Sequence, residues 1–218
     1  TRPAMAIKPQ RTVQAFPSPI LVFENPAHAE LRPRLVEACQ ALRRRDPGVQ
    51  RSNLGGSWHS PDDLFKLKDP AVQQARGFIQ SCIEGAMNGL EAEKAASMDV
   101  SLYGWININP QHAINKPHNH PDSLFSGCYY VQVPASSDPM SGLIEFLDPR
   151  TGANMVSSPY LAFKPSLAMR PQAGQLFIFP SYLSHWVTPN AEPEDRISIA
   201  FNARVNMRRA ESAATPAH

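Results

Sequence analysis

The segment S-L-Y-G-W-I-N-I-N, residues 101–109, decides the fold class of this 218-residue chain. Leucine and isoleucine alternate in it with aromatic and amide side chains, which is the two-residue repeat of a β-strand with one buried face. Later apolar segments, bounded by Pro, Gly, Ser or Asp, predict further strands at 126–133, 142–147, 174–180 and 196–202. Short strands at this spacing indicate a mainly β protein, a sandwich or barrel.

Upstream of this segment the apolar residues follow the period of helices. In residues 28–45 they recur at helical spacing, and Asp46-Pro47-Gly48 is a stop signal. A second helix begins at Asp69-Pro70, an N-cap followed by a first-turn proline, and carries an apolar stripe to residue 90. Residues 17–26, a short apolar run between prolines, predict an edge strand. Because two helices with one apolar face each need a surface to cover, we expect an α+β protein with its N-terminal helices packed on the major sheet.

Length and composition predict one domain over residues 1–218. It divides into a strand and supporting helices (15–97), a β core (98–206) and a polar tail that frays (207–218). The formal net charge of +2 indicates neither a nucleic-acid nor a membrane partner, and no feature indicates an oligomeric state. Three widely spaced cysteines form no disulfide framework, no segment reaches the ~20 apolar residues of a membrane span, and no signal peptide is evident. We therefore expect a cytoplasmic protein.

The stretch K-P-H-N-H-P-D, residues 116–122, carries candidate metal ligands. Residues before proline favour extended backbone, and residues two apart on an extended chain point the same way. His118 and His120 can therefore face one metal ion, and so can His120 and Asp122. With the distant His185 either pair makes a facial triad, which leaves open positions on octahedral iron. Pro121 has no amide hydrogen to continue a ladder, which favours the three histidines over the set with Asp122.

Residues 185–202 supply a second group of polar candidates. If residues 188–195 contain the turn of a hairpin, Arg196 lies opposite His185. Alternation places Arg196 and Ser198 on one face of the strand and the isoleucines and phenylalanine on the other. An inward arginine with a hydroxyl two residues on suits a bound carboxylate. Further upstream, Trp58 and His59 either wall a substrate entrance or pack a loop.

Taken in order, the segments H-N-H-P, S-G-C-Y-Y-V, G-L-I-E-F-L-D-P-R, P-Q-A-G-Q-L-F-I-F-P-S-Y-L-S-H and R-I-S-I-A-F-N resemble the 2-oxoglutarate-Fe(II) oxygenase superfamily. The similarity is greatest to a bacterial and phage subfamily with the order H-x-H-P, H and R-x-S, and it runs from about residue 103 to 205. It implies a double-stranded β-helix, the jelly roll of the cupins, with iron(II) near one mouth. It also implies a dioxygenase that hydroxylates a substrate and releases succinate and CO2.

The resemblance also implies roles for individual residues. The distal histidine of the family corresponds to His185 and its 2-oxoglutarate arginine to Arg196, with Ser198 as the hydroxyl of R-x-S. Most of the superfamily uses H-x-D, whereas this subfamily carries H-x-H-P without requiring an acid at the position of Asp122, so both triads stay open. Further candidate contacts to the cosubstrate, on strands expected to line the barrel, are Asn107, Tyr129 and Tyr130. One of the two tyrosines should face inward and the other outward.

Two other interpretations fit the same residues. A cupin-like metalloenzyme would bind metal through the histidines without using 2-oxoglutarate. A noncatalytic jelly-roll module would carry His118 and His120 in a polar loop. The substrate of an oxygenase stays open among small metabolites, peptidyl side chains and nucleic-acid components, since the small net charge selects none of them.

Overall fold

A computed structural model describes residues 10–11, 16–95, 98–152, 155 and 164–207. The elements in chain order are β1 (Leu21–Glu24), α1 (His28–Arg45), β2 (Asn53–Leu54), β3 (Trp58–His59), the 3-10 helix η1 (Leu64–Lys66), α2 (Pro70–Ala95), β4 (Met98–Asn109), β5 (Ile114–His118), β6 (Phe125–Gln132), β7 (Ile144–Leu147), β8 (Ser166–Met169), β9 (Gln175–Pro180), β10 (His185–Val187) and β11 (Arg196–Met207). The predicted frayed tail, 207–218, lies outside the described residues apart from Met207, the last residue of β11.

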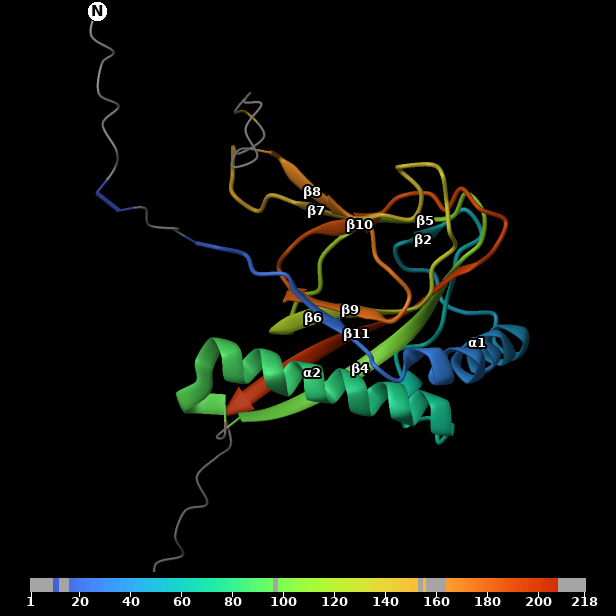
Figure 1. Ribbon diagram of the computed structural model, residues 1–218, viewed down its shortest axis with the longest axis horizontal. Helices are drawn as coiled ribbons and strands as arrows, with labels where there is room; N and C mark the ends of the chain where they lie inside the picture. The colour runs from blue at the N-terminus through green and yellow to red at the C-terminus, as the bar shows by residue number, and fades with distance from the viewer. Residues whose placement is uncertain (1–9, 12–15, 96–97, 153–154, 156–163, 208–218) are drawn as a thin grey trace, which may run out of the picture.

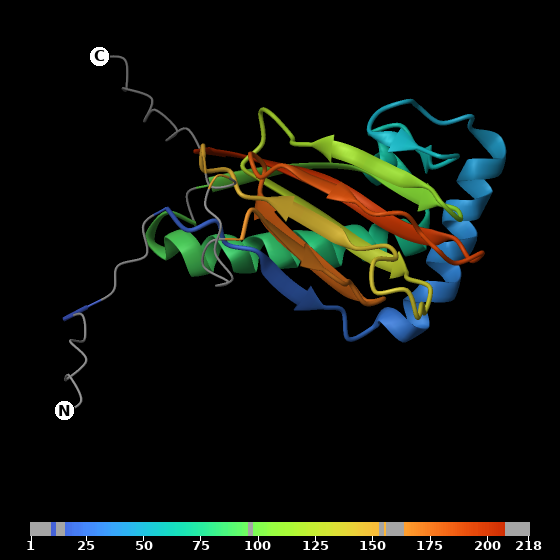
Figure 2. The ribbon, with the colours of Figure 1, turned by 90° about the horizontal axis from the view of Figure 1, so that it is seen from above.

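The strands form two antiparallel sheets that face each other (Figure 1). The major sheet has the order β1-β9-β6-β11-β4-β3, and the minor sheet has the order β2-β5-β10-β7-β8. Both helices cover the outer face of the major sheet, where α2 runs beneath the strands and α1 lies at one end (Figure 2). This is the predicted double-stranded β-helix with N-terminal helices on the major sheet. Neither described helix has the combination of length and apolarity that crossing a bilayer requires.

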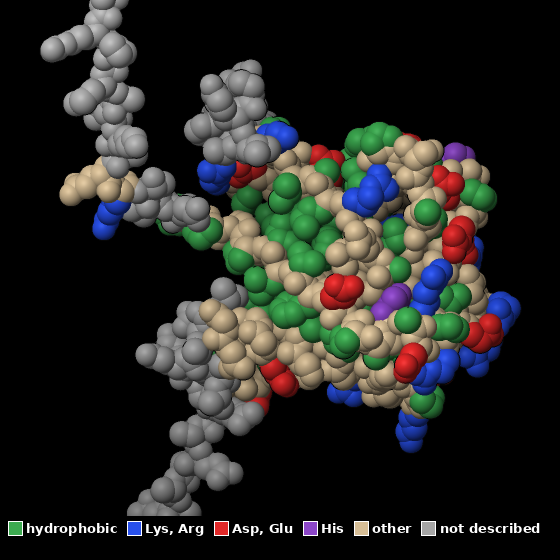
Figure 3. All heavy atoms as spheres, in the orientation of Figure 1, with side chains coloured by type: hydrophobic (Ala, Val, Ile, Leu, Met, Phe, Trp, Pro, Cys, Tyr) green, Lys and Arg blue, Asp and Glu red, His purple; other side chains and the backbone are tan. Residues whose placement is uncertain are grey.

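The apolar face of β11 packs against the helices. Ile197, Ile199 and Phe201 are at most 1% exposed and join the core cluster formed with α1 and α2. Val72 and Ile79, on the apolar stripe of α2, are fully buried in the same cluster. Because neighbouring residues of a strand point to opposite sides, this burial turns the alternate residues of β11 toward the space between the sheets. A smaller apolar cluster, which includes Phe146 of the minor sheet and Phe179 of the major sheet, fills part of that space. On the face seen in Figure 3, hydrophobic side chains gather between the two sheets.

The predicted hairpin between residues 185 and 196 is wrong. His185 lies on β10, between β5 and β7 of the minor sheet, whereas Arg196 begins β11, between β4 and β6 of the major sheet. The intervening residues cross from one sheet to the other. Asn190 stabilises this crossing because its Nδ2 donates to the carbonyl oxygens of Asn109 (3.1 Å) and Glu194 (2.8 Å). The two strands therefore face each other across the barrel instead of pairing.

Candidate active site

A cavity of about 660 Å³ lies between the sheets. Residues from β5 and β10 of the minor sheet line it on one side, and residues from β4, β6 and β11 of the major sheet line it on the other. Its size is within the range of ligand pockets, roughly 300–1,000 Å³. The cavity brings together His118, His120, His185, Arg196 and Ser198, although the chain separates the first and last of these by 80 positions.

Three histidines converge on one point of this cavity. His118 is the register partner of His185 across β5 and β10, and His120 follows β5 by two residues. One nitrogen from each ring can be chosen so that all three atoms lie within 4.8 Å of one another, a spacing that could hold a metal ion. The ring centroids are 4.5 Å apart for His118 and His185 and 5.3 Å apart for His120 and His185.

Backbone carbonyl groups orient two of these rings. Nδ1 of His118 donates to the carbonyl oxygen of Lys116 (2.7 Å), and Nδ1 of His185 donates to that of Leu183 (3.0 Å). Because a carbonyl oxygen only accepts, each Nδ1 carries the proton and each Nε2 keeps its lone pair. This arrangement, in which the second ring nitrogen of a ligand is held by the backbone, is typical of metal-binding histidines.

Burial keeps the histidine cluster uncharged at neutral pH. Desolvation lowers the pKa of His118, lowers that of His120 to about 4, and lowers that of His185 to about 3. The neighbouring rings lower the pKa of His120 and His185 further. Three neutral imidazoles with free lone pairs fit a divalent first-row metal such as iron(II).

Asp122, the alternative ligand, is not in this cluster. It lies in the turn after His120 with a φ of 64°, and it lines the same cavity. A left-handed residue ends the alternation of the extended chain, so the rule that residues two apart point the same way stops applying at this position. Sequence reasoning identified Pro121 as the end of the strand but had no signal for the left-handed turn.

Arg196 is a buried cation without an anionic partner. It is 2% exposed, and its Nε and Nη2 atoms have no hydrogen-bond partner among the described residues. No ion pair within the described part of the chain includes it. Its guanidinium lies 5.1 Å from the ring centroid of Tyr130, and Gly142 lies beside its stem, where an added Cβ would be 3.4 Å from Cδ. Since an unpaired buried charge is unfavourable, this geometry suits an anionic ligand that enters the cavity.

Three further unpartnered polar atoms flank Arg196. Ser198 is the register partner of Asn107 on β4 and of Tyr130 on β6. The Ser198 hydroxyl, the Tyr130 hydroxyl and Oδ1 of Asn107 are buried without hydrogen-bond partners among the described residues, and all three residues line the cavity. Burial raises the pKa of Tyr130 well above its usual value, so its hydroxyl stays a donor. One cation and two hydroxyl donors thus surround space suited to a carboxylate.

Strand register decides which tyrosine of the pair faces the cavity. The pairing of β6 with β11 is regular from Phe125 opposite Ala203 to Tyr130 opposite Ser198, and a bulge at Val131 follows. Tyr130 therefore faces inward with Ser198. Tyr129 faces the helices, where its hydroxyl accepts a hydrogen bond from Asn25 Nδ2 (3.1 Å) and lies 2.8 Å from Nδ1 of His28. Of the two tyrosines named as cosubstrate contacts, Tyr129 therefore lies outside the cavity.

His59 walls the cavity, whereas Trp58 does not. The His59 ring is 4% exposed and stacks on Trp105 with centroids 5.3 Å apart and planes at 11°. Trp58 belongs to the core cluster, and its Nε1 donates to the carbonyl oxygen of Asp46 (3.0 Å). Trp105 itself has a buried Nε1 without a hydrogen-bond partner among the described residues. It was not singled out from the sequence, although it lies two residues before Asn107 on the same strand and therefore points to the same face.

A family model described as "Putative 2OG-Fe(II) oxygenase" matches residues 103–202, the segment that contributes the histidine cluster and Arg196. The match, over just under half of the chain, indicates a 2OG-Fe(II) oxygenase. The oxygenase is therefore an oxidoreductase, and its cofactors are iron(II) and 2-oxoglutarate, as the resemblance implied. No curated protein matches the chain.

Solved structures share the fold of the oxygenase at low sequence identity. A prolyl-4-hydroxylase from Pseudomonas putida has a TM-score of 0.62 and 16% identity, with 88% of this chain and 93% of that chain covered. HygX from Streptomyces hygroscopicus, solved with nickel, 2-oxoglutarate and hygromycin B, has a TM-score of 0.60 and 13% identity, with 86% and 83% covered. A prolyl hydroxylase from Trichoplax adhaerens, solved with a fragment of the hypoxia inducible factor, has a TM-score of 0.59 and 11% identity, with 85% and 83% covered.

Proposed function

We propose that this oxygenase hydroxylates a small-molecule or peptidyl substrate, with iron(II) held by His118, His120 and His185 and the distal carboxylate of 2-oxoglutarate bound by Arg196. The observation that carries the proposal is the buried, unpaired guanidinium of Arg196 in the same cavity as the histidine cluster. A cupin-like metalloenzyme without 2-oxoglutarate would leave that buried charge without a ligand.

The chain's own residues orient both cofactors. The carbonyl oxygens of Lys116 and Leu183 hold the rings of His118 and His185 so that each Nε2 lone pair is available to the metal. At the other end of the cosubstrate, Arg196 supplies a charged fork. The hydroxyls of Tyr130 and Ser198 complete the polar lining there. When bound, iron(II) would allow O2 to act as the oxidant of both 2-oxoglutarate, which gives succinate and CO2, and a substrate C–H bond, which gives an alcohol.

The remaining wall of the cavity offers a surface for the substrate. The stacked rings of His59 and Trp105 form part of it, together with Tyr103. Nδ1 of His59 donates to the carbonyl oxygen of Ser60 (2.6 Å), so its Nε2 is the nitrogen available as an acceptor. An aromatic wall with a few polar atoms suits a small organic group or a peptide side chain. Two solved structures with this fold contain hygromycin B and a peptide fragment, which supports the same two classes of substrate.

We also propose that the oxygenase acts in the cytoplasm. All three cysteines are free thiols, and two of them, Cys39 and Cys82, are buried. Burial raises their pKa, to about 12 for Cys39 and about 11 for Cys82, which keeps both protonated and unreactive. Such cysteine use is typical of a reducing compartment.

The proposed function is tested by anaerobic titration of the Fe(II)-loaded protein with 2-oxoglutarate, following the visible charge-transfer band of the chelate. We expect a saturable band in the native protein and at least about a hundredfold weaker binding in Arg196→Gln, since a charge-assisted pair is lost. Arg204→Gln is the matched control because Arg204 is also on β11 and lines the same cavity. It is exposed, however, and its Nε already donates to the carbonyl oxygen of Asp122 (3.2 Å). Native-like titration of Arg196→Gln would overturn the assignment of Arg196.

A further inference from the structure

We propose that Asp195 is a positioning residue, which α1 holds so that the next residue, Arg196, is presented correctly to 2-oxoglutarate. The inference rests on the proposed function, because it concerns how the guanidinium meets the distal carboxylate. Asp195 itself does not line the cavity. Any effect it has on the cosubstrate must therefore pass through Arg196.

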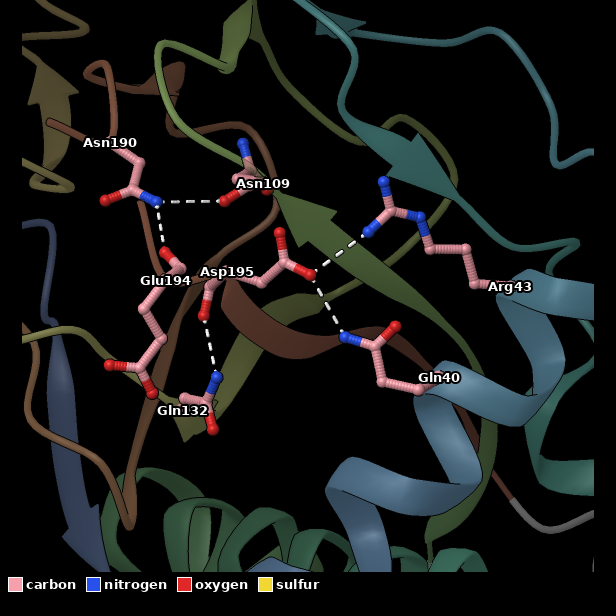
Figure 4. A network of polar contacts seen from close by, with 7 residues as sticks. All are labelled: Gln40, Arg43, Asn109, Gln132, Asn190, Glu194 and Asp195. Carbon is pink, nitrogen blue, oxygen red and sulfur yellow. Dashed lines mark hydrogen bonds and ion pairs between the residues drawn. The ribbon is translucent and has the colours of Figure 1, made fainter. Parts of the chain in front are cut away.

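The carboxylate of Asp195 is bound from α1 by two side chains (Figure 4). Its Oδ2 accepts hydrogen bonds from Nε2 of Gln40 (3.0 Å) and from Nη1 of Arg43 (3.1 Å). The two charged side chains are only partly exposed, 21% for Asp195 and 33% for Arg43. Two hydrogen bonds to one oxygen, from residues three apart on one face of a helix, hold the carboxylate on the outer side of the major sheet.

Arg43 differs from the two arginines that follow it. Arg44 pairs with Glu37 (2.8 Å) and Arg45 donates to the carbonyl oxygen of Ala41 (3.1 Å), so both are satisfied within α1. Arg43 instead reaches out of the helix to the segment before β11. The arginine run at the end of α1 thus contains one residue that connects the helix to the active-site strand.

The backbone around Asp195 is held as well. Nε2 of Gln132 donates to the carbonyl oxygen of Asp195 (2.9 Å), the group that shares a peptide bond with Arg196. Nδ2 of Asn190 bridges the carbonyl oxygens of Glu194 and Asn109, and Asn109 is the register partner of Arg196. These contacts hold the two residues before Arg196 and its register partner on β4, and so fix the direction in which the chain enters β11.

Arg196 needs such support because little else fixes its guanidinium. Its Nε and Nη2 atoms have no hydrogen-bond partner among the described residues, so the side chain is positioned by packing on Tyr130 and beside Gly142. A site that the backbone holds in place before binding loses less conformational entropy than a site that becomes ordered when the ligand arrives. The same fixed geometry keeps the carboxylate of Asp195 on the far side of the sheet from the arginine beside it, where it does not compete with the cosubstrate.

The test compares two ligands in two charge-matched variants, both Fe(II)-loaded and kept anaerobic. Asp195→Ala is expected to weaken 2-oxoglutarate binding about tenfold, which corresponds to the free energy of roughly one hydrogen bond. Pyruvate, which chelates iron but lacks the distal carboxylate, is expected to bind Asp195→Ala within about twofold of the native protein. Glu194→Ala removes the same charge from the same turn, and its ion pair with Arg32 is long (3.7 Å) and exposed, so we expect less than about a twofold change.

A double-mutant cycle separates this inference from the proposed function. In the Arg196→Gln background, Asp195→Ala is expected to add less than about a twofold effect, because a residue that acts through Arg196 has nothing left to position. If Arg196→Gln weakens binding but Asp195→Ala does not, the inference is wrong and the proposed function stands. If Arg196→Gln binds 2-oxoglutarate normally, the proposed function fails first.

Two further outcomes bear on Asp195 alone. Equal weakening of pyruvate and 2-oxoglutarate in Asp195→Ala would show a general structural role and overturn the inference. If Asp195→Ala does not fold, as judged by circular dichroism, Gln40→Ala and Arg43→Gln remove one contact each. Each of them should then weaken 2-oxoglutarate binding about two- to fivefold while leaving pyruvate binding unchanged. Native-like 2-oxoglutarate binding in both variants would overturn the inference.

Discussion

Replacing Arg196 with methionine is expected to stabilise the cofactor-free protein while weakening 2-oxoglutarate binding at least about a hundredfold. The guanidinium is 2% exposed, and two of its nitrogens are unpartnered. An unsatisfied buried polar atom is unfavourable by ~1–3 kcal/mol, so two of them destabilise the fold by about 2–6 kcal/mol. Methionine retains much of the packing of the stem but loses the contact of the guanidinium with the Tyr130 ring, worth about 1–2 kcal/mol. The balance predicts that the free energy of unfolding rises by up to about 5 kcal/mol.

Urea denaturation of the metal-free protein, followed by circular dichroism, measures this change. In the presence of Mn(II), adding 2-oxoglutarate at a hundred times the native Kd should raise the free energy of unfolding by about 2.7 kcal/mol for the native protein and by no more than about 0.4 kcal/mol for Arg196→Met. Arg204→Met, at an exposed position of the same strand, should change the free energy of unfolding by no more than about 1 kcal/mol. An Arg196→Met variant less stable than the native protein in the metal-free state would show that the guanidinium is already paired in the free enzyme, and the reasoning would fail.

Three other predictions follow from the same geometry. Tyr130→Phe should weaken 2-oxoglutarate binding about five- to tenfold in the anaerobic titration, whereas Tyr129→Phe should leave binding unchanged and lower the free energy of unfolding by about 1–2 kcal/mol, because its hydroxyl bonds on the helix side. Gly127→Ala should destabilise the fold by about 3 kcal/mol in urea denaturation, since its Cβ would lie 2.5 Å from a backbone carbonyl oxygen of β9, and a native-like midpoint would contradict this. The cofactor-free protein should lose stability as pH falls below about 6.5. The reason is that His120 and His185 bind protons at that pH in the unfolded chain, whereas in the folded protein their pKa values are about 4 and about 3. The free energy of unfolding should fall by up to about 1.4 kcal/mol per pH unit for each ring, and a His185→Gln variant should show a shallower slope.

Much of the cavity face could be read from the chain. Alternation in residues 101–109 and 196–202 was enough to turn Asn107, Arg196 and Ser198 to the same side, away from the apolar residues that pack on the helices. The helices themselves follow from apolar spacing and end signals, and the predicted bounds of α1 agree with the structure. These features are predictable because the direction of a side chain on a regular strand or helix depends on its neighbours in sequence.

Other parts of the site depend on contacts between distant segments. The inward position of Tyr130 depends on the register of β6 against β11, and the exclusion of Asp122 from the histidine cluster depends on a left-handed turn. The placement of His59 against Trp105 requires the pairing of β3 with β4 across more than forty residues. Local periodicity contains no information on strand register, left-handed turns or the pairing of distant strands, because each is selected by the packing of the whole barrel.

The crossing from β10 to β11 shows the difference most directly. Residues 185 and 196 are close enough in sequence to suggest a hairpin, but each strand finds two partners in its own sheet, and the turn between them is held by Asn190 and by the contacts of Asp195 with α1. Residue identities and their alternation determined which side chains are available to iron and to 2-oxoglutarate. Only the assembly of the two sheets determined that these side chains meet in one cavity, because the distance between the sheets is set by backbone pairing and core packing over the whole chain.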